Sequence, residues 1–235
     1  MEVRGTRDLP FKIAIVGGGP AGTAIIVRAI RLGVIDELLG QDPADVSSAG
    51  LLLCEAGPAS KLGSGELGNY AVNSNTYASK FVGHVVNDRP DVIPPERASG
   101  TVLEPLRNTP AASVLEGMGA QVAPLSQIGA FLEEVGKAVR SVLTDHPESA
   151  CLCDTKVRGA EQMGSSGLFR LALTQTGGGP FAIREVYASK LILATGGCQR
   201  LPVRDRFSAP HNKVILRYTI ISLPDPFSPP AMPLL

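Results

Sequence analysis

The pattern of apolar and polar positions divides the chain into short apolar runs and amphipathic segments. Ile13-Ala14-Ile15-Val16 is an uninterrupted apolar run, which is typical of a strand buried on both faces of a parallel sheet. After a glycine cluster, apolar residues recur at helical spacing at Ala24, Ile25, Ala29 and Leu32. Arg28 and Arg31 fall on another face, and Gly33 is placed to end the helix. Residues 13–33 therefore predict a strand, a tight turn and a helix.

A second apolar run ends in an acidic residue. Leu51-Leu52-Leu53-Cys54-Glu55 predicts another buried parallel strand, with Glu55 at its carboxyl end. Residues 34–50, between the two strands, are polar and rich in turn formers, which indicates an insertion on the surface.

The second half of the chain predicts a packing helix, a strand and a hairpin. The helix extends from Gln127 to about Thr144, and Ser126 is available as its N-cap. Its apolar stripe comprises Ile128, Phe131, Leu132, Val135, Val139, Val142 and Leu143. Residues 151–158 predict a strand, and residues 168–176 and 181–187 predict a hairpin around the turn at 177–180. Because no helix follows Pro180, the glycines of this turn do not predict a second phosphate loop.

Residues 57–121 have the least regular pattern, and prolines accumulate between Asn87 and Pro110. That stretch either covers a ligand or is disordered. The segment 73–76 and Tyr77 either line a substrate site or form ordinary turns, and turn chemistry is the favoured interpretation. Residues 217–235 are rich in proline and show neither a strand nor a helix pattern.

The glycines at 17, 19 and 22 satisfy the spacing G-x-G-x-x-G. In a nucleotide-binding turn, the first glycine permits a sharp bend, the second lets the backbone approach a pyrophosphate, and the third lets the helix pack on the strand. The phosphates then accept hydrogen bonds from free N–H groups at the helix N-terminus, where the macrodipole also favours negative charge. The alternative is an ordinary glycine turn between a buried strand and a helix.

In such a fold the acid at the end of the second strand binds the ribose hydroxyls of the dinucleotide, and Glu55 is the candidate. Glu55 follows Gly22 by 33 positions. The usual separation from the glycines is about 20 positions, and the insertion at 34–50 accounts for the difference. The alternative is a solvated carboxylate at a strand end.

Composition narrows the class of protein. The chain has 235 residues, 44% of them hydrophobic, and 22 basic residues balance 22 acidic ones. The zero formal charge argues against a nucleic-acid or anionic-membrane partner. Residues 1–10 lack an apolar signal region, and no run has the length of a membrane span, so we expect a cytoplasmic protein.

Cysteine and histidine residues suggest neither disulfides nor a metal site. Cys54 and Cys153 are expected to be small buried hydrophobic residues, and Cys151 and Cys153 to share one sheet face without the C-x-x-C redox spacing. His84, His146 and His211 lack metal-ligand spacing, and no G-x-S-x-G motif marks a nucleophile. We therefore expect no metal and assign no catalytic residue.

Two motifs resemble those of FAD-dependent oxidoreductases. Residues 17–22, Gly-Gly-Gly-Pro-Ala-Gly, are similar to the glycine motif of flavoproteins that bind FAD on a Rossmann-like domain, and residues 191–197, Leu-Ile-Leu-Ala-Thr-Gly-Gly, resemble the strand that closes such a domain. The resemblance implies an α/β fold with a Rossmann-like parallel sheet and a small antiparallel β-meander. It places the FAD/NAD(P)-binding domain at 11–203, with an irregular insertion at about 57–121, followed by a proline-rich tail at 204–235.

The resemblance also implies which residues hold the cofactor. Val157 would contact the adenine through its backbone, Lys61 would offer a charge to phosphate, and Ser64 and Gly65 would let the backbone approach the flavin ring. The complete implied set is Gly17, Gly18, Gly19, Pro20, Ala21, Gly22, Glu55, Lys61, Gly65, Val157, Ala194, Thr195 and Gly196.

The expected function is FAD-binding oxidoreductase, with NAD(P)H as candidate electron donor, a small-molecule substrate and a monooxygenase-like reaction among the candidates. This family usually continues into a substrate or NAD(P)H domain and carries a late Gly-Asp, a dipeptide that does not occur here. The alternatives are therefore a shortened, catalytically silent dinucleotide-binding fragment and a plain NAD-binding domain.

Overall fold

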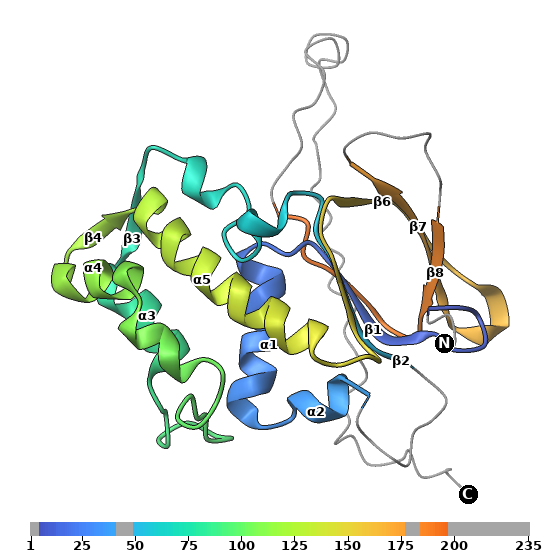
Figure 1. The fold of residues 1–235 in the computed structure, drawn as a ribbon, viewed down its shortest axis with the longest axis horizontal. Coiled ribbons are helices and arrows are strands. Elements are labelled where there is room, and N and C mark those ends of the chain that lie inside the picture. The colour runs from blue at the N-terminus through green and yellow to red at the C-terminus, as the bar shows by residue number, and fades with distance from the viewer. Residues whose placement is uncertain (1–4, 41–48, 177–183, 197–235) are drawn as a thin grey trace, which may run out of the picture. The chain divides into compact units, whose positions relative to one another are not determined.

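A parallel sheet lies at the centre of the structure (Figure 1). The computed structural model describes residues 5–40, 49–176 and 184–196. The parallel strands are β5 (Ala150–Leu152), β2 (Ala49–Cys54), β1 (Phe11–Val16) and β9 (Leu191–Leu193), in that order across the sheet. The register pairs Val16 with both Cys54 and Leu193, so neighbouring strands end at the same edge.

Both faces of β1 and β2 are buried, and successive residues serve different cores. Ile15, Leu51 and Leu53 face the helices, whereas Ala14, Leu52 and Cys54 face an antiparallel meander. A strand alternates its side chains between faces, so two buried faces require a continuous apolar sequence. The two apolar runs therefore predicted these strands correctly.

Helix α1 (Pro20–Leu32) connects β1 to β2, and helix α5 (Leu125–Thr144) precedes β5. As predicted, Gly33 ends α1, in a left-handed conformation with φ of 70°. The predicted N-cap of α5 is wrong. The helix begins at Leu125 with Pro124 in the cap position, so Ser126 lies inside the first turn. Proline suits a helix start because its φ is already restricted and an N–H group there has no helical partner.

The meander consists of β6 (Thr155–Gln162), β7 (Phe169–Gln175) and β8 (Arg184–Ala188). Its strands pair antiparallel, as in Val157 with Leu173 and Leu171 with Val186. The predicted hairpin turn at 177–180 lies outside the described residues. The strand predicted at 151–158 is two strands, because the chain turns at Asp154, which has a positive φ of 50°. The fold class read from the sequence is confirmed.

The region expected to be irregular contains regular structure. It includes β3 (Asn73–Tyr77), α3 (Ala78–Val86) and α4 (Pro110–Met118), and β3 pairs with β4 (Val122–Pro124). The stretch favoured as turns, 73–77, is thus a strand. Short helices draw most of their stability from packing, and α3 buries Val82, Val85 and Val86 in the helical core. Residues 87–103 do lack helices and named strands.

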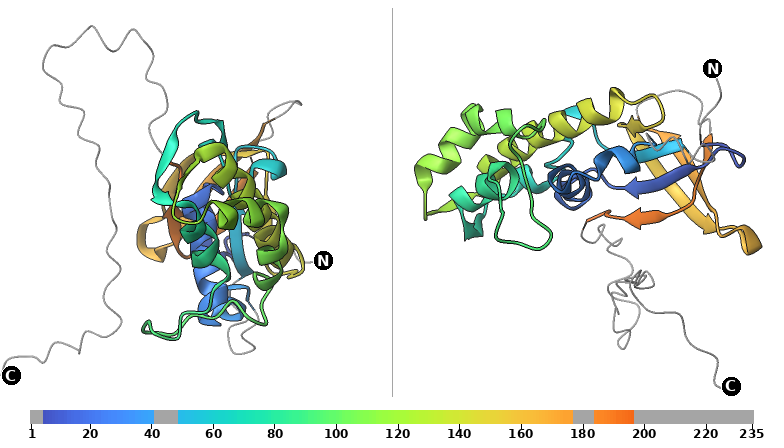
Figure 2. Two further views of the ribbon diagram at one scale, coloured as in Figure 1. Left: turned by 90° about the vertical axis from the view of Figure 1, so that its left-hand side faces the viewer. Right: turned by 90° about the horizontal axis from the view of Figure 1, so that it is seen from below.

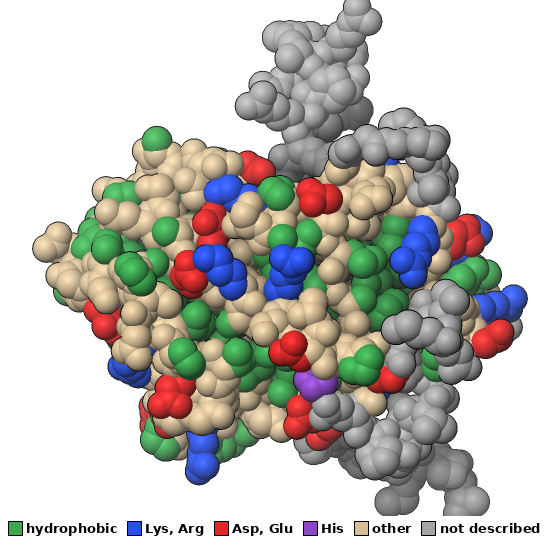
Figure 3. All heavy atoms as spheres, in the orientation of Figure 1, with side chains coloured by type: hydrophobic (Ala, Val, Ile, Leu, Met, Phe, Trp, Pro, Cys, Tyr) green, Lys and Arg blue, Asp and Glu red, His purple; other side chains and the backbone are tan. Residues whose placement is uncertain are grey.

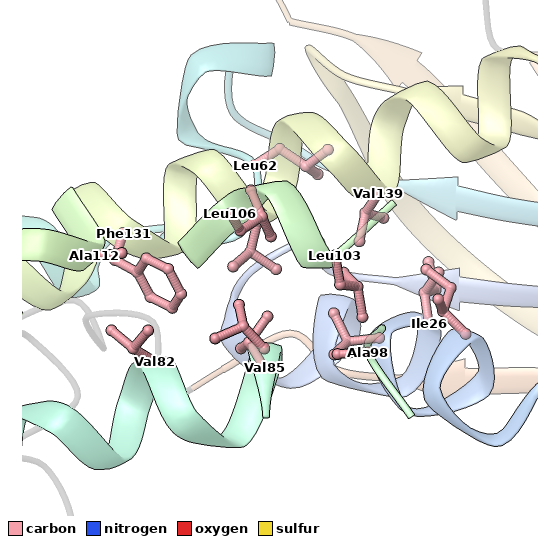
Figure 4. Close-up of a cluster of buried hydrophobic side chains, with 14 of the residues drawn as sticks. Ile26, Leu62, Val82, Val85, Ala98, Leu103, Leu106, Ala112, Phe131 and Val139 are labelled. Carbon is pink, nitrogen blue, oxygen red and sulfur yellow. The ribbon is translucent and has the colours of Figure 1, made fainter. Parts of the chain in front are cut away.

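The helical core lies between α1, α3 and α5. Figure 4 shows side chains from these helices and from the irregular segments meeting there, including Leu62, Leu103, Leu106 and Phe131. Figure 2 shows α3 and α4 beside the first half of α5, at the end away from the meander. The remaining short helices are α2 (Ile35–Leu38) and the 3₁₀ turns Ala59–Lys61, Leu67–Asn69, Glu104–Asn108 and Gly164–Ser166.

Within the described residues, no helix combines the length and apolar character that crossing a bilayer requires. On the face shown in Figure 3, the basic and acidic side chains of those residues are interspersed. The predicted domain limit at 203 and the tail at 204–235 lie outside the described residues.

Candidate cofactor-binding site

The carboxyl ends of the four parallel strands bring the sequence motifs together. Gly17 follows β1, Glu55 follows β2, Cys153 follows β5 and Ala194 follows β9. In open α/β sheets, ligands bind outside this edge of the sheet. The two motifs of residues 17–22 and 191–197 are thus neighbours in space, as the resemblance implied.

Gly17 and Gly22 make the turn sterically possible. The Gly17 N–H donates to the Cys54 carbonyl at 2.8 Å, and its φ is 106°. A Cβ at Gly17 would lie 2.3 Å from the Ala194 oxygen, and a Cβ at Gly22 would lie 1.9 Å from the Gly17 oxygen. Real Cβ atoms do not approach oxygen so closely, so the backbone contacts require glycine at both positions.

The N-terminus of α1 is lined by small residues. Gly19 is its N-cap, Pro20 is the first helical residue, and Ala21 is exposed. No side-chain hydrogen bond caps the helix within the described residues. Gly65 approaches from the loop after β2, where an added Cβ would lie 3.4 Å from the Gly19 Cα. No described side chain occupies the N–H groups in the first turn of the helix, which fits an anionic ligand such as a diphosphate.

Glu55 points into the glycine turn. Its Oε2 accepts from the Gly18 N–H at 2.6 Å, and its Oε1 accepts from the Gly57 N–H at 2.7 Å. Its own backbone is fixed by bonds to Leu152 and Thr155 at 2.8 and 2.9 Å. A carboxylate offers about four acceptor positions, so two hydrogen bonds leave capacity for the hydroxyl donors of a ribose.

Lys61 forms an ion pair in this structure. Its Nζ lies 2.7 Å from Glu133 Oε1 on α5, and the Ser64 hydroxyl donates to the same oxygen at 3.1 Å. The pair joins the loop after β2 to the helix. The phosphate contact assigned to Lys61 therefore stays a prediction.

Sequence reasoning missed two glycines of α5 that support this loop. A Cβ at Gly136 would lie 2.0 Å from the Leu62 oxygen, and one at Gly129 would lie 2.6 Å from the Gly68 Cα. The Gly63 N–H in turn donates to the Gly18 oxygen at 2.8 Å. The signal was available, because a glycine inside a helix costs about 1 kcal/mol relative to alanine and two in one helix suggest a close backbone approach.

The other predicted residues lie beside the same edge. The Ala194 N–H donates to the Val16 carbonyl at 2.8 Å, which holds Ala194, Thr195 and Gly196 next to Gly17. Val157 lies on β6, two residues beyond Thr155, whose N–H donates to the Glu55 carbonyl. The backbone of β6 therefore lies next to Glu55. The adenine contact of Val157 stays a prediction.

Cys151 and Cys153 share one face as expected, with their Sγ atoms 4.0 Å apart. The hydrogen bond from Cys151 lowers the pKa of Cys153 to about 7. Burial raises the pKa of Cys54 to about 12. Cys54 is buried as predicted, whereas Cys153 is only half-buried. Across the residues that the structure describes, no three His, Cys, Asp or Glu side chains gather as a metal site would require.

Comparison with known proteins places this geometry in a fold class. No protein-family model matches the chain. CMP-5'-(3-aminopropyl)phosphonate hydroxylase of Streptomyces rubellomurinus is 31% identical over 147 residues, which are 63% of this chain and 29% of that protein. The reduced form of ornithine hydroxylase (PvdA) from Pseudomonas aeruginosa aligns with a TM-score of 0.51 at 17% identity, covering 83% of this chain and 40% of that one.

The chain has a Rossmann-type α/β fold, the fold that it shares with this ornithine hydroxylase. The resemblance read from residues 17–22 and 191–197 is thereby confirmed for the fold. Because the chain spans less than half of either similar protein, the activity of the complete protein is a separate question.

Proposed function

We propose that this chain binds FAD and forms the FAD-binding part of an oxidoreductase. The observation that carries the proposal is the convergence of the turn at 17–22, Glu55 and the segment 194–196 at the carboxyl edge of the parallel sheet. Each motif alone has an ordinary structural explanation. Their meeting at the ligand-binding edge of a Rossmann-type sheet favours a dinucleotide.

The residues present fit such a ligand. The diphosphate would accept hydrogen bonds from the backbone at Gly19, Ala21 and Gly22, beside the Gly18 N–H that Glu55 already holds. Glu55 would accept from the ribose hydroxyls, and the Val157 backbone would contact the adenine. Gly65, Thr195 and Gly196 would let the backbone approach the rest of the cofactor. When bound, FAD supplies the hydride and electron transfer, while the protein binds and orients it.

The second, more specific part of the proposal concerns the reaction: a hydroxylase-like reaction on a small molecule, with NAD(P)H as electron donor. Its support is the curated relative, whose name is that of a hydroxylase. We assign the FAD-binding domain to residues 11–203 and a separate tail to 204–235. No described side chain is assigned a catalytic role.

Flavin binding is tested first on the purified full chain. FAD should raise the thermal midpoint, because a ligand that binds only the native state stabilises it. Glu55→Gln replaces one acceptor oxygen by an amide that repels the Gly18 or Gly57 N–H, and we expect FAD affinity to fall by about tenfold or more. Glu116→Gln, at an exposed position of α4, is the matched control. Equal FAD affinity in both variants, or no response of the wild type, would refute the assignment.

Turnover is tested separately by anaerobic reduction of the bound flavin with NADPH, followed by absorbance. Reduction would support the oxidoreductase. Bound FAD that NADPH does not reduce would instead support the dinucleotide-binding fragment without catalysis.

A further inference from the structure

A second feature of the structure lies along α1, on the side that faces α3. A cavity of about 210 Å³ opens there between α1, α3, α5 and the segment at 89–96. Its lining combines an apolar part, formed by Val27, Val85, Leu132 and Val135, with a charged part formed by Arg28, Arg31, Arg89 and Glu96. The volume is below the 300 Å³ or so of pockets for drug-sized ligands, so an occupant would be small.

Hydrogen bonds from Arg31 hold the charged part of the cavity in place. Arg31, which is 2% exposed, uses all three of its nitrogen atoms. Its Nε donates to Glu96 Oε2 at 2.8 Å, and its two terminal nitrogens donate to the Val85 and Asn87 carbonyls at 2.6 Å each. The Glu96 backbone pairs with Arg89 in both directions, at 2.8 and 3.1 Å. Arg31 thus joins α1, the end of α3 and the 89–96 segment into one rigid wall.

Positive charge exceeds negative charge around this cavity. Three guanidinium groups line it, against the single carboxylate of Glu96. The hydrogen bond from Arg31 lowers the pKa of Glu96, which keeps that carboxylate ionised at neutral pH. Asp88 is close in sequence, but its Oδ1 accepts from the Ala98 and Ser99 N–H groups at 2.7 and 3.0 Å. When Asp88 is counted as well, the three positive charges still exceed the negative charges of the two carboxylates.

Two of the guanidinium groups retain donors for a ligand. Arg28 pairs with Glu96 through one nitrogen, and its side chain is 52% exposed. The Arg89 side chain has no hydrogen bond or ion pair with any other described residue. An arginine presents five N–H donors in a planar fork that matches phosphate oxygens. A cavity with donors at one end and an apolar wall at the other selects an oxyanion on a short apolar body.

We propose that this cavity is a binding site for a small organic phosphate or phosphonate, with Arg28 and Arg89 as its ligands and Arg31 as a positioning residue. The oxyanion lies between the exposed guanidinium group of Arg28 and the half-buried one of Arg89, and the apolar body packs on Val27, Val85, Leu132 and Val135. The cavity also reaches Pro20, Thr23 and Ala24 in the first turns of α1. Its charged ligands lie on a later turn of α1 and on the 89–96 segment, whereas the dinucleotide site uses backbone N–H groups at the helix N-terminus. It does not depend on flavin binding.

Isothermal titration of the full chain with propylphosphonate at low ionic strength tests the site. The chief variant is Arg89→Gln, because it removes a guanidinium group without breaking a described ion pair. We expect its dissociation constant to rise about tenfold, the effect of losing one charge-assisted hydrogen bond. Arg28→Gln combined with Arg89→Gln should raise it further. Arg184→Gln, at an exposed position on β8, should leave it unchanged.

Inorganic phosphate is the second probe, and it separates the two parts of the cavity. Weaker binding of phosphate than of propylphosphonate supports the role of the apolar wall, whereas equal binding would overturn that role and leave a site for free phosphate. The proposal fails if the wild type shows no saturable binding up to about 20 mM, or if Arg89→Gln binds as the wild type does. FAD affinity measured on the same variants should be unchanged, so failure of the flavin assignment would be recognised independently.

Discussion

The two ends of α1 favour an anionic ligand by different physical means. At its N-terminus, Gly17, Gly19 and Gly22 remove side chains, so that backbone N–H groups and the helix dipole can act on a ligand. Along its later turns, Arg28 and Arg31 supply formal charge through side chains held by Glu96. The backbone site depends on glycines, which have no Cβ atom to block the N–H groups. The side-chain site depends on the Glu96 carboxylate, which holds the arginine side chains in place. The two sites should therefore fail in different ways.

The largest effect is expected at the buried ion pair. Arg31→Leu leaves the Glu96 carboxylate, which is 3% exposed, with only Arg28 as an ion-pair partner, and it also frees the Val85 and Asn87 carbonyls. We expect a loss of about 4 kcal/mol in the free energy of unfolding, measured with urea. Arg28→Leu, which removes the exposed partner of the same carboxylate, should cost about 1 kcal/mol. Equal losses would show that Arg31 does not organise the wall.

The next effect concerns the glycine turn. Gly22→Ala places a Cβ against the Gly17 oxygen, at 1.9 Å before any relaxation. We expect about 3 kcal/mol of destabilisation in urea unfolding and loss of FAD binding, because the turn must open. Gly117→Ala is the matched control, since nothing lies within 4 Å of a Cβ there. In helix α4 that change should stabilise by about 0.5 kcal/mol. A fully stable Gly22→Ala variant would contradict the close contact.

A smaller effect is expected in acid. The pKa of Glu96 is lowered in the folded protein by its hydrogen bond to Arg31. Its contribution to stability is therefore complete above the unfolded-state pKa of about 4.3 and is lost as the pH falls through the lower folded-state value. Urea midpoints measured from pH 6 to pH 3 should fall less steeply in Glu96→Gln than in the wild type. Parallel curves would show that other carboxylates carry the acid sensitivity.

The smallest effect should come from Lys61. Its ion pair with Glu133 is partly exposed, with 41% of the lysine side chain accessible, so Lys61→Met should cost about 0.5 kcal/mol in unfolding free energy. The same variant tests the predicted phosphate contact. Unchanged FAD affinity would leave Lys61 with only its link to α5, whereas a clear loss of affinity would support a contact with the diphosphate.

Much of the fold and of the residues that meet at the candidate site could be predicted because their signals are local. Buried parallel strands appear as apolar runs, and a tight turn that must admit a backbone or a ligand appears as glycines at fixed spacing. The acid at 55 could be found from its place at a strand end, even with an unusual separation from Gly22. These features were identified from single stretches of at most ten residues.

The rest could not be predicted because it depends on tertiary contacts. Helices α3 and α4 have nine residues each, and their apolar faces are short. Arg31 looks like a surface residue in the helical pattern, yet its partners at Val85, Asn87 and Glu96 lie 54 to 65 positions away. Thr109, which caps α4 by accepting from the Ala112 N–H at 3.2 Å, was a usable local signal in front of Pro110.

The hydrogen bonds that Glu55 accepts from Gly18 and Gly57 have a kinetic consequence. They fix the turn at 17–22 to the end of β2 and to the loop that follows it. A dinucleotide that binds there has little backbone to order, so the entropic cost of association is reduced. Capture should then follow a single exponential whose rate rises linearly with FAD concentration, without the plateau that a slow rearrangement before binding would impose.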